Sequence, residues 1–320
     1  MENALIYLMI SAASYPFLSV YNSCAALFRS MGNSKISMQI SLVINITNII
    51  LNAVFIFGFR MGVAGVALAS CISRAAAAVY LSVKIRNPEL LVYVKWSDLK
   101  HFRWRMVKNI LRIGIPNALE NSLFQLGRIV VVTVITAFGT AQVAANAVAN
   151  NLDAIGCIPG QALNLAMITV VGQCIGAQDF GQAKFYIRRL MRNAYLLTGI
   201  VNILIIVTLP VSLKLYSLSG ETLRLASIMI LIHCGFAILL WPASFTLPNA
   251  LRAASDVTFT MVVSIISMAI FRILASYIIG YRMGMGAIGV WIAMILDWIC
   301  RASCFIFRLL SGKWQEKAFL

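Results

Sequence analysis

The sequence is poor in acidic residues and in histidine. Its 320 residues include 10 aspartates and glutamates and 2 histidines, and charged residues of all kinds make up 11%. Soluble domains contain about 25% charged residues. Together with 61% hydrophobic residues, this scarcity of charge excludes an ordinary soluble globular protein and indicates a chain that lies in a lipid bilayer.

Other absences narrow the function. The sequence has no Gly-rich phosphate loop of the Walker type, so it does not support ATP hydrolysis, and we expect no enzyme. The seven cysteines lie in apolar runs without the spacing of zinc ligands, so we expect core roles for them, with no metal site and no bound cofactor. The net charge of +16 does not predict nucleic-acid binding, because the basic residues follow a membrane topology.

Long apolar runs predict about nine transmembrane helices, and therefore an all-α, polytopic membrane protein. Each run meets the requirement of about 20 apolar residues for a span. The predicted domains are a partial N-terminal lobe of three helices (1–83), a linker (84–108), a six-helix C-terminal lobe (109–310) and a tail (311–320). The predicted spans are residues 4–28, 36–58, 62–83, 109–137, 143–176, 186–210, 222–251, 255–280 and 285–309.

The positions of the basic residues predict the orientation. Most of the 26 lysines and arginines lie on one set of loops and span ends, and the linker at 84–108 is richest in them. Since cytoplasmic loops carry an excess of Lys and Arg, we expect this linker and the C-terminus to be cytoplasmic. The same residues attract anionic lipid. The expected partners are the bilayer and small organic substrates, without nucleic acid, and the oligomeric state stays open.

One hairpin with a Gly-rich turn occurs twice. Arg60-Met-Gly precedes Gly65-Val, and Arg282-Met-Gly precedes Gly289-Val, each after an apolar run. Internal duplication is typical of membrane transporters, in which a cavity forms between related halves. The alternative is chance similarity between two apolar hairpins. The fourth to sixth spans have no counterpart in the chain.

Several short segments, taken in order, resemble a known family. They are Asn45 to Asn52 (NITNIILN), Gly114 to Asn121 (GIPNALEN), Gly139 to Asn146 (GTAQVAAN), Val171 to Ala177 (VGQCIGA) and Val290 to Met294 (VWIAM). Together they resemble the multidrug and toxic compound extrusion (MATE) family of bacterial efflux pumps. The resemblance implies twelve helices in two lobes of six, of which this chain matches helices four to twelve. The family's first helix, which in many members carries an acidic proton-coupling residue, has no counterpart here.

The resemblance implies an inner-membrane secondary transporter. Such a protein exports organic, often cationic, compounds by H⁺ or Na⁺ antiport, with alternating access between two lobes. One alternative is a truncated or partner-dependent remnant of such a transporter. Another is a flippase for lipid-linked saccharide, which should line its cavity with several cations. Only Arg128 and Arg272 are predicted to lie deep enough in the spans for that role.

Three carboxylates within spans are candidates for cation coupling, because ionisable groups are costly in the membrane and mark function there. They are Glu120, Asp153 and Asp297. Glu120 is the clearest, and its alternative role is a buried side chain that a nearby Asn or Arg satisfies. For Asp297 we favour a structural ion pair with Arg272, on the preceding span, and Arg301, one turn further along.

Polar side chains recur at helical spacing along the fifth span, from Asn146 to Asn164, and Pro159-Gly160 is expected to interrupt this helix. Such a stripe favours the lining of a water-filled cavity, and interhelical hydrogen bonding is the alternative. Trp241-Pro242 and Pro248 predict a kink in the seventh span. The candidates for the substrate cavity are Asn45, Asn48, Asn117, Asn146, Asn150, Gln161 and Asn164.

Overall fold

The computed structural model describes residues 2–95, 103–216 and 218–318, and their regular structure is helical throughout. Nine helical segments among them are long and apolar enough to cross a membrane. The predicted all-α membrane fold is therefore confirmed. The chain forms two compact units, Met1–Arg103 and Trp104–Leu320, which are described separately below. The finer division into lobes, linker and tail stays a prediction.

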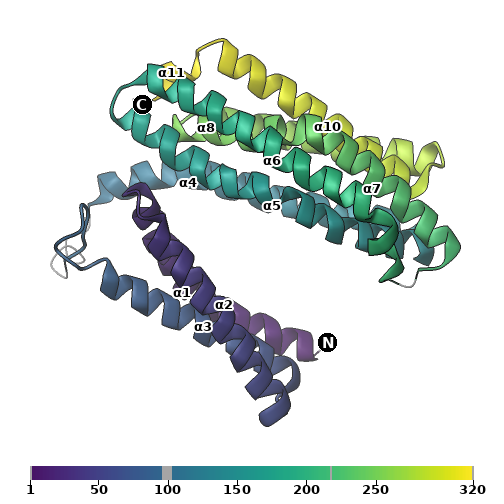
Figure 1. Cartoon of the computed structure of the whole chain (residues 1–320), viewed down its shortest axis with the longest axis horizontal. Coiled ribbons are helices and arrows are strands. Elements are labelled where there is room, and N and C mark those ends of the chain that lie inside the picture. The colour runs from purple at the N-terminus through teal and green to yellow at the C-terminus, as the bar shows by residue number, and fades with distance from the viewer. Residues whose placement is uncertain (1, 96–102, 217, 319–320) are drawn as a thin grey trace. The chain divides into compact units, whose positions relative to one another are not determined.

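The N-terminal unit is a three-helix hairpin assembly with a small core (Figure 1). Phe28 and Leu81 are fully buried in that core. Polar side chains add bonds between the helices: Arg74 Nη1 donates to Ser14 Oγ at 2.6 Å. The elements are α1 (Glu2–Ser30), α2 (Ser34–Ala53), the π-helix η1 (Val54–Gly58) and α3 (Gly62–Lys84).

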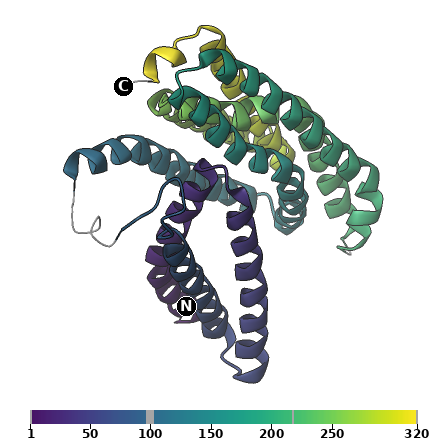
Figure 2. The same cartoon turned by 60° about the vertical axis from the view of Figure 1, so that its left-hand side comes forward.

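The C-terminal unit is a larger bundle in which long helices run beside one another (Figure 2). Its main core includes Trp291 and Trp298 of the last long helix, packed with apolar side chains of four other helices. The elements are α4 (Trp104–Thr136), α5 (Thr140–Gly176), α6 (Phe180–Lys214), α7 (Gly220–Trp241), η3 (Pro242–Thr246), α8 (Leu247–Ala253), α9 (Val257–Ser267), η4 (Met268–Leu274), η5 (Ser276–Arg282), α10 (Gly286–Leu310) and α11 (Trp314–Lys317).

Two prolines that the sequence predicts to disturb their helices, Pro242 and Pro159, behave differently. At Pro242, α7 ends and gives way to the π-helical turn η3, as expected where a proline removes a helical hydrogen bond. In contrast, α5 runs through Pro159 without a break. The predicted interruption at Pro159-Gly160 is therefore wrong. Gly160 instead makes room for the ring of Trp241, which a β-carbon at that position would overlap.

The duplicated turn has the same backbone character in both copies. Gly62 and Gly284 both have positive φ values, of 55° and 71°, a region in which glycine carries no steric penalty. Further along, a β-carbon on Gly65 would lie 2.9 Å from Phe55 Cβ, and one on Gly289 would lie 2.9 Å from the backbone of Ile279. In each copy, the helix after the turn packs closely on the segment before it because a side chain is missing.

Candidate functional site

The C-terminal unit contains a cavity of about 360 Å³ with mostly polar walls. Its walls come from α4, α5, α10 and the segments around η3, α8 and η4. Aromatic rings form part of the surface, from Phe124, Trp241, Phe245 and Trp298. A second cavity of about 70 Å³ shares Arg128, Asn150, Arg272 and Met294 with it. The unit therefore holds a cavity with polar and charged walls among helices that are otherwise apolar.

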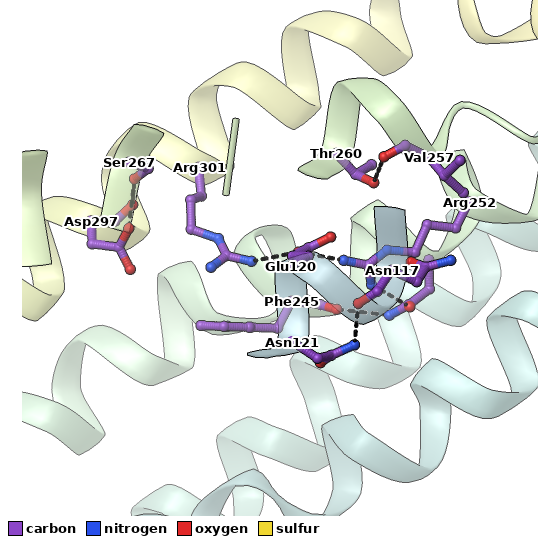
Figure 3. A network of polar contacts seen from close by, with 11 residues as sticks. Asn117, Glu120, Asn121, Phe245, Arg252, Val257, Thr260, Ser267, Asp297 and Arg301 are labelled. Atoms are coloured by element: carbon purple, nitrogen blue, oxygen red, sulfur yellow. Dashed lines mark hydrogen bonds and ion pairs between the residues drawn. The ribbon is translucent and has the colours of Figure 1, made fainter. Parts of the chain in front are cut away.

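Glu120 lies at the wall of this cavity, held by two arginines (Figure 3). Its Oε1 lies 2.6 Å from Nη2 of Arg252 and 3.7 Å from Nη2 of Arg301. Arg252 Nη1 also donates to Asn249 Oδ1 at 2.9 Å. The side chain of Glu120 is 7% exposed, and its Oε2 has no hydrogen-bond partner. One oxygen thus contacts the arginines, while the other is buried without a partner.

Aromatic rings also lie close to the guanidinium group of Arg301. Its guanidinium lies 4.7 Å from the ring centroid of Phe245 and 5.7 Å from that of Phe124. A guanidinium over an aromatic face gains electrostatic attraction, and the gain is larger where water is excluded. Since Arg301 is almost fully buried, the rings and Glu120 together compensate its charge.

Asp297 does not form the ion pair that its sequence position predicts. Among the described residues, no ion pair within 4.0 Å joins Asp297 to Arg272 or to Arg301. Its Oδ1 instead accepts a hydrogen bond of 2.5 Å from Ser267 Oγ, and Oδ2 is buried without a partner. Figure 3 shows Arg301 directed toward Glu120 and Asp297 facing Ser267. The helical spacing of Asp297 and Arg301 allowed a local pair, but Glu120 on α4 competes for the same arginine.

Asp153 on α5 contacts a histidine of α7. Its Oδ1 lies 2.8 Å from Nε2 of His233 and accepts a hydrogen bond of 3.1 Å from Cys157 Sγ. His233 is 1% exposed, and its ring packs edge-on against Trp291 and Trp298. Asp153 reaches the cavity, with its side chain 26% exposed. The pair thus connects the cavity surface to a fully buried histidine.

These three side chains also offer one oxygen, one sulfur and one nitrogen atom within 4.8 Å of one another. Borderline metals such as zinc bind this set of atoms. Cysteine spacing alone could not reveal the group, because His233 comes from a different helix from Asp153 and Cys157.

The polar stripe of α5 has two kinds of contact. Asn150, Gln161 and Asn164 line the larger cavity with Asp153 and Cys157. Asn146 does not line that cavity; it borders the smaller one, and its Oδ1 accepts a bond of 3.0 Å from Trp291 Nε1. Cavity lining and interhelical bonding, which the sequence offered as alternatives, therefore occupy different parts of one helix.

The other asparagine candidates lie elsewhere. Asn117 Nδ2 donates to the carbonyl of Ile113 at 3.0 Å within α4, and Asn117 does not line the larger cavity. Asn45 and Asn48 belong to the N-terminal unit. Asn45 is exposed there, and Asn48 Nδ2 donates to Ser70 Oγ at 3.2 Å.

Sequence reasoning missed the extent of positive charge at the cavity. It placed only Arg128 and Arg272 deep enough, whereas Arg252 and Arg301 also line the cavity. Arg272 lies 5.5 Å from the ring centroid of Phe124. The cavity carboxylates are Glu120 and Asp153, so guanidinium groups outnumber them. One signal in the sequence could have indicated Arg252 as a cavity residue: Asn249 and Arg252 lie three residues apart, just after Pro248, and therefore share a helical face.

The nine candidate spans among the described residues and the charged cavity inside one helical bundle define a polytopic membrane protein with a polar interior site. A comparison with family models then identifies which one. The model described as MatE matches residues 1–54 and 116–278, and the chain belongs to this family, the MATE efflux transporters. The resemblance seen in the sequence is therefore confirmed.

Individual relatives match nearly the whole chain, which spans about 70% of their own length. The chain is 26% identical over 322 residues to a probable multidrug resistance protein NorM of Thermotoga maritima, covering 98% of this chain and 68% of that protein. It is 27% identical over 327 residues to the uncharacterized transporter YisQ of Bacillus subtilis, covering 99% of this chain and 70% of that protein.

Solved structures share the fold at low identity. A MATE crystal structure in the bent conformation matches with a TM-score of 0.86 at 19% identity, over 99% of this chain and 70% of the other. A MOP superfamily transporter from Pyrococcus furiosus, described as having reverse polarity of its binding pocket, matches with a TM-score of 0.88 at 18% identity, over 98% and 70%.

Proposed function

We propose that this chain carries out ion-coupled export of organic compounds, exchanging H⁺ or Na⁺ for substrate by alternating access. Family membership and the charged cavity in the C-terminal unit support this proposal. The expected location is a bacterial inner membrane, with the segment at 84–108 and the C-terminus cytoplasmic. Transport needs a site whose occupancy changes the relative stability of two conformations.

The ion cluster of Glu120, Arg252 and Arg301 carries the proposal. A cation that binds the Glu120 carboxylate competes with both guanidinium groups for its charge. When a proton or Na⁺ occupies Glu120, the contacts that hold α4 to α8 and α10 weaken. The ion thereby favours a conformation in which these helices are arranged differently, which is the linkage that an antiporter requires.

Asp153 and His233 form the second proposed coupling site. A carboxylate in contact with an imidazole at 2.8 Å can exchange a proton with it, and the exposed edge of Asp153 connects the pair to the cavity. Asp297 is the weakest of the three sequence candidates, because it is fully buried and does not line the cavity.

The charge of the wall sharpens the proposed substrate class. The resemblance implied organic compounds that are often cationic. Four arginines against two carboxylates favour compounds that carry an acidic group, because complementary charge is what binding sites select. The asparagine and glutamine side chains supply hydrogen bonds, and the aromatic rings supply an apolar surface. Arg272→Gln should therefore weaken the binding of a fluorescent organic anion to the purified chain more than that of a fluorescent cation.

The test of coupling is Glu120→Gln, which removes the charge and keeps the shape. The chain is reconstituted in liposomes, and efflux of a fluorescent organic compound is measured with and without an imposed H⁺ or Na⁺ gradient. We expect Glu120→Gln to abolish the response to the gradient. Glu221→Gln, at an exposed position in the first turn of α7, is the matched control and should keep it. Unchanged gradient-driven efflux in Glu120→Gln rejects the assignment.

A further inference from the structure

A third concavity of the C-terminal unit lies apart from the charged cavity. It is a groove of about 540 Å³ between α6, the η3–α8 segment, the end of α10 and the turn into α11. It shares no lining residue with the charged cavity. Its volume falls within the range of about 300–1,000 Å³ that is typical of ligand sites.

Three basic side chains line this groove along one face of α6. Lys184, Arg188 and Arg192 follow one another at intervals of four residues, so they lie one above the other on the helix. All three are exposed. Within the described part of the chain, no ion pair of 4.0 Å or less includes any of them. The nearby carboxylate of Asp179 caps α6 instead, accepting a bond of 2.8 Å from the backbone N–H of Gln182.

The rest of the groove is apolar. Its other lining residues include Ile187, Met191, Leu247, Leu309 and Leu310. The fully buried Trp314 closes the end near the chain terminus, where it packs edge-on against Phe180 at 6.0 Å between ring centroids. The groove therefore combines an unpaired row of cations with an apolar surface along the same helix.

The length of the groove distinguishes its ligand from a small ion. From Lys184 to Tyr195 the helix rises roughly 16 Å, at 1.5 Å per residue. Since α6 is a candidate membrane span, a molecule lying along it would have its charged end at the span terminus and its apolar part deeper in the bilayer. A phospholipid has this arrangement, and basic pockets between transmembrane helices bind anionic head groups.

We propose that the groove binds one anionic phospholipid. Lys184, Arg188 and Arg192 hold the phosphate through charge-assisted hydrogen bonds. The glycerol and upper acyl chains lie against Met191, Tyr195 and Leu309. This lipid would brace α6 against α10, and its binding does not depend on transport through the charged cavity.

The test measures lipid binding to the purified full chain in detergent. Dioleoylphosphatidylglycerol is titrated, and the unfolding midpoint is followed, with dioleoylphosphatidylcholine as the neutral comparison. We expect saturable stabilisation by phosphatidylglycerol alone. The triple variant Lys184→Gln, Arg188→Gln, Arg192→Gln should bind it about 100-fold more weakly, since each basic side chain near an anionic surface contributes roughly fivefold.

Arg189→Gln is the matched control. Arg189 lies on the same helix but outside the groove, with its guanidinium 6.0 Å from the ring centroid of Phe185. It removes one positive charge, as Arg188→Gln does, and should change the affinity by no more than about twofold. If the triple variant does not fold, Arg188→Gln alone should show a roughly fivefold loss. A triple variant that binds phosphatidylglycerol as the wild type does, or equal stabilisation by inorganic phosphate, overturns the proposal.

Discussion

The two units satisfy their interior polar groups in different ways. In the N-terminal unit, Arg74 donates to the hydroxyl of Ser14, and the hydroxyls of Tyr21 and Ser41 lie 2.8 Å apart. In the C-terminal unit, Glu120 and Asp256 form ion pairs with arginines of other helices. Among the described residues of the N-terminal unit, no ion pair within 4.0 Å occurs.

The two units therefore share a backbone feature but differ in their buried charges. Both units contain the same Gly-rich turn, and in both a glycine permits a close approach of helices. Among the residues that the structure describes, buried charged side chains occur only in the C-terminal unit. The repeat therefore preserves packing geometry, whereas the charged interior that we propose for coupling belongs to the C-terminal unit. Perturbing matched positions in the two units tests this separation.

The largest expected effect comes from removing a carboxylate that holds buried arginines. Glu120→Met should destabilise the chain by about 3–5 kcal/mol, because breaking a buried ion pair leaves the partner charge uncompensated. Ser14→Ala removes the acceptor of Arg74 in the N-terminal unit and should cost less, about 1.5–3 kcal/mol, the value for a hydrogen bond to a charged group. Denaturant unfolding of the purified chain in detergent measures both. Equal losses of unfolding free energy would mean that the ion pairs of Glu120 stabilise the chain no more than the Arg74–Ser14 hydrogen bond does.

A smaller contrast is expected at the two glycines of the repeat. A β-carbon on Gly289 would meet backbone atoms of Ile279 and Gly280 at 2.9 Å, whereas one on Gly65 would meet mainly Phe55 Cβ. Neither a backbone atom nor a β-carbon can move without the main chain, but Gly289 would meet three atoms at 2.9 Å and Gly65 only one. Gly289→Ala should therefore cost about 2–3 kcal/mol and Gly65→Ala about 1–2 kcal/mol. Thermal unfolding in detergent reports both changes.

The control for these alanines is Gly235→Ala in α7. A β-carbon there has no neighbouring atom within 4 Å, and alanine favours a helix over glycine by about 1 kcal/mol. This variant should be as stable as the parent or slightly more so. If Gly65→Ala proves as costly as Gly289→Ala, the two turns are equally packed, and the contrast drawn here is wrong.

The helices could be predicted from the sequence because their cause is local. Length and apolarity set a membrane span, so nine spans were found with ends close to those in the structure. The polar stripe of α5 was found for the same reason: residues three or four apart share a helical face. Of its predicted members, Asn150, Gln161 and Asn164 reach the larger cavity.

The contacts at the cavity could not be predicted, because they depend on which helices meet. Glu120 and Arg252 are 132 residues apart, and no local pattern connects them. Asp153 and His233 pair across two helices in the same way. Asp297 and Arg301 illustrate a different limit of the sequence. Their spacing within one helix predicts an ion pair, whereas Glu120 of another helix is the carboxylate within 4.0 Å of this arginine, and Asp297 interacts with it only at longer range.

The smallest expected effect concerns Asp297, and it separates the two interpretations of this residue. In the structure its carboxylate accepts from Ser267 and has no arginine within 4.0 Å. Asp297→Asn keeps an oxygen for Ser267 and removes a charge from the interior. Its unfolding free energy in detergent should therefore change by less than about 1 kcal/mol.

Asp256→Asn is the matched control for this substitution. Asp256 is also buried, but Arg308 donates to both of its oxygens, at 2.7 and 3.3 Å. Losing that ion pair should cost about 3 kcal/mol. If Asp297→Asn lowers the unfolding free energy as much as Asp256→Asn does, an arginine compensates the charge of Asp297. That result would support the ion pair that the sequence predicts. A small change at Asp297 beside a large one at Asp256 places the charges that stabilise this unit at the helix-to-helix ion pairs.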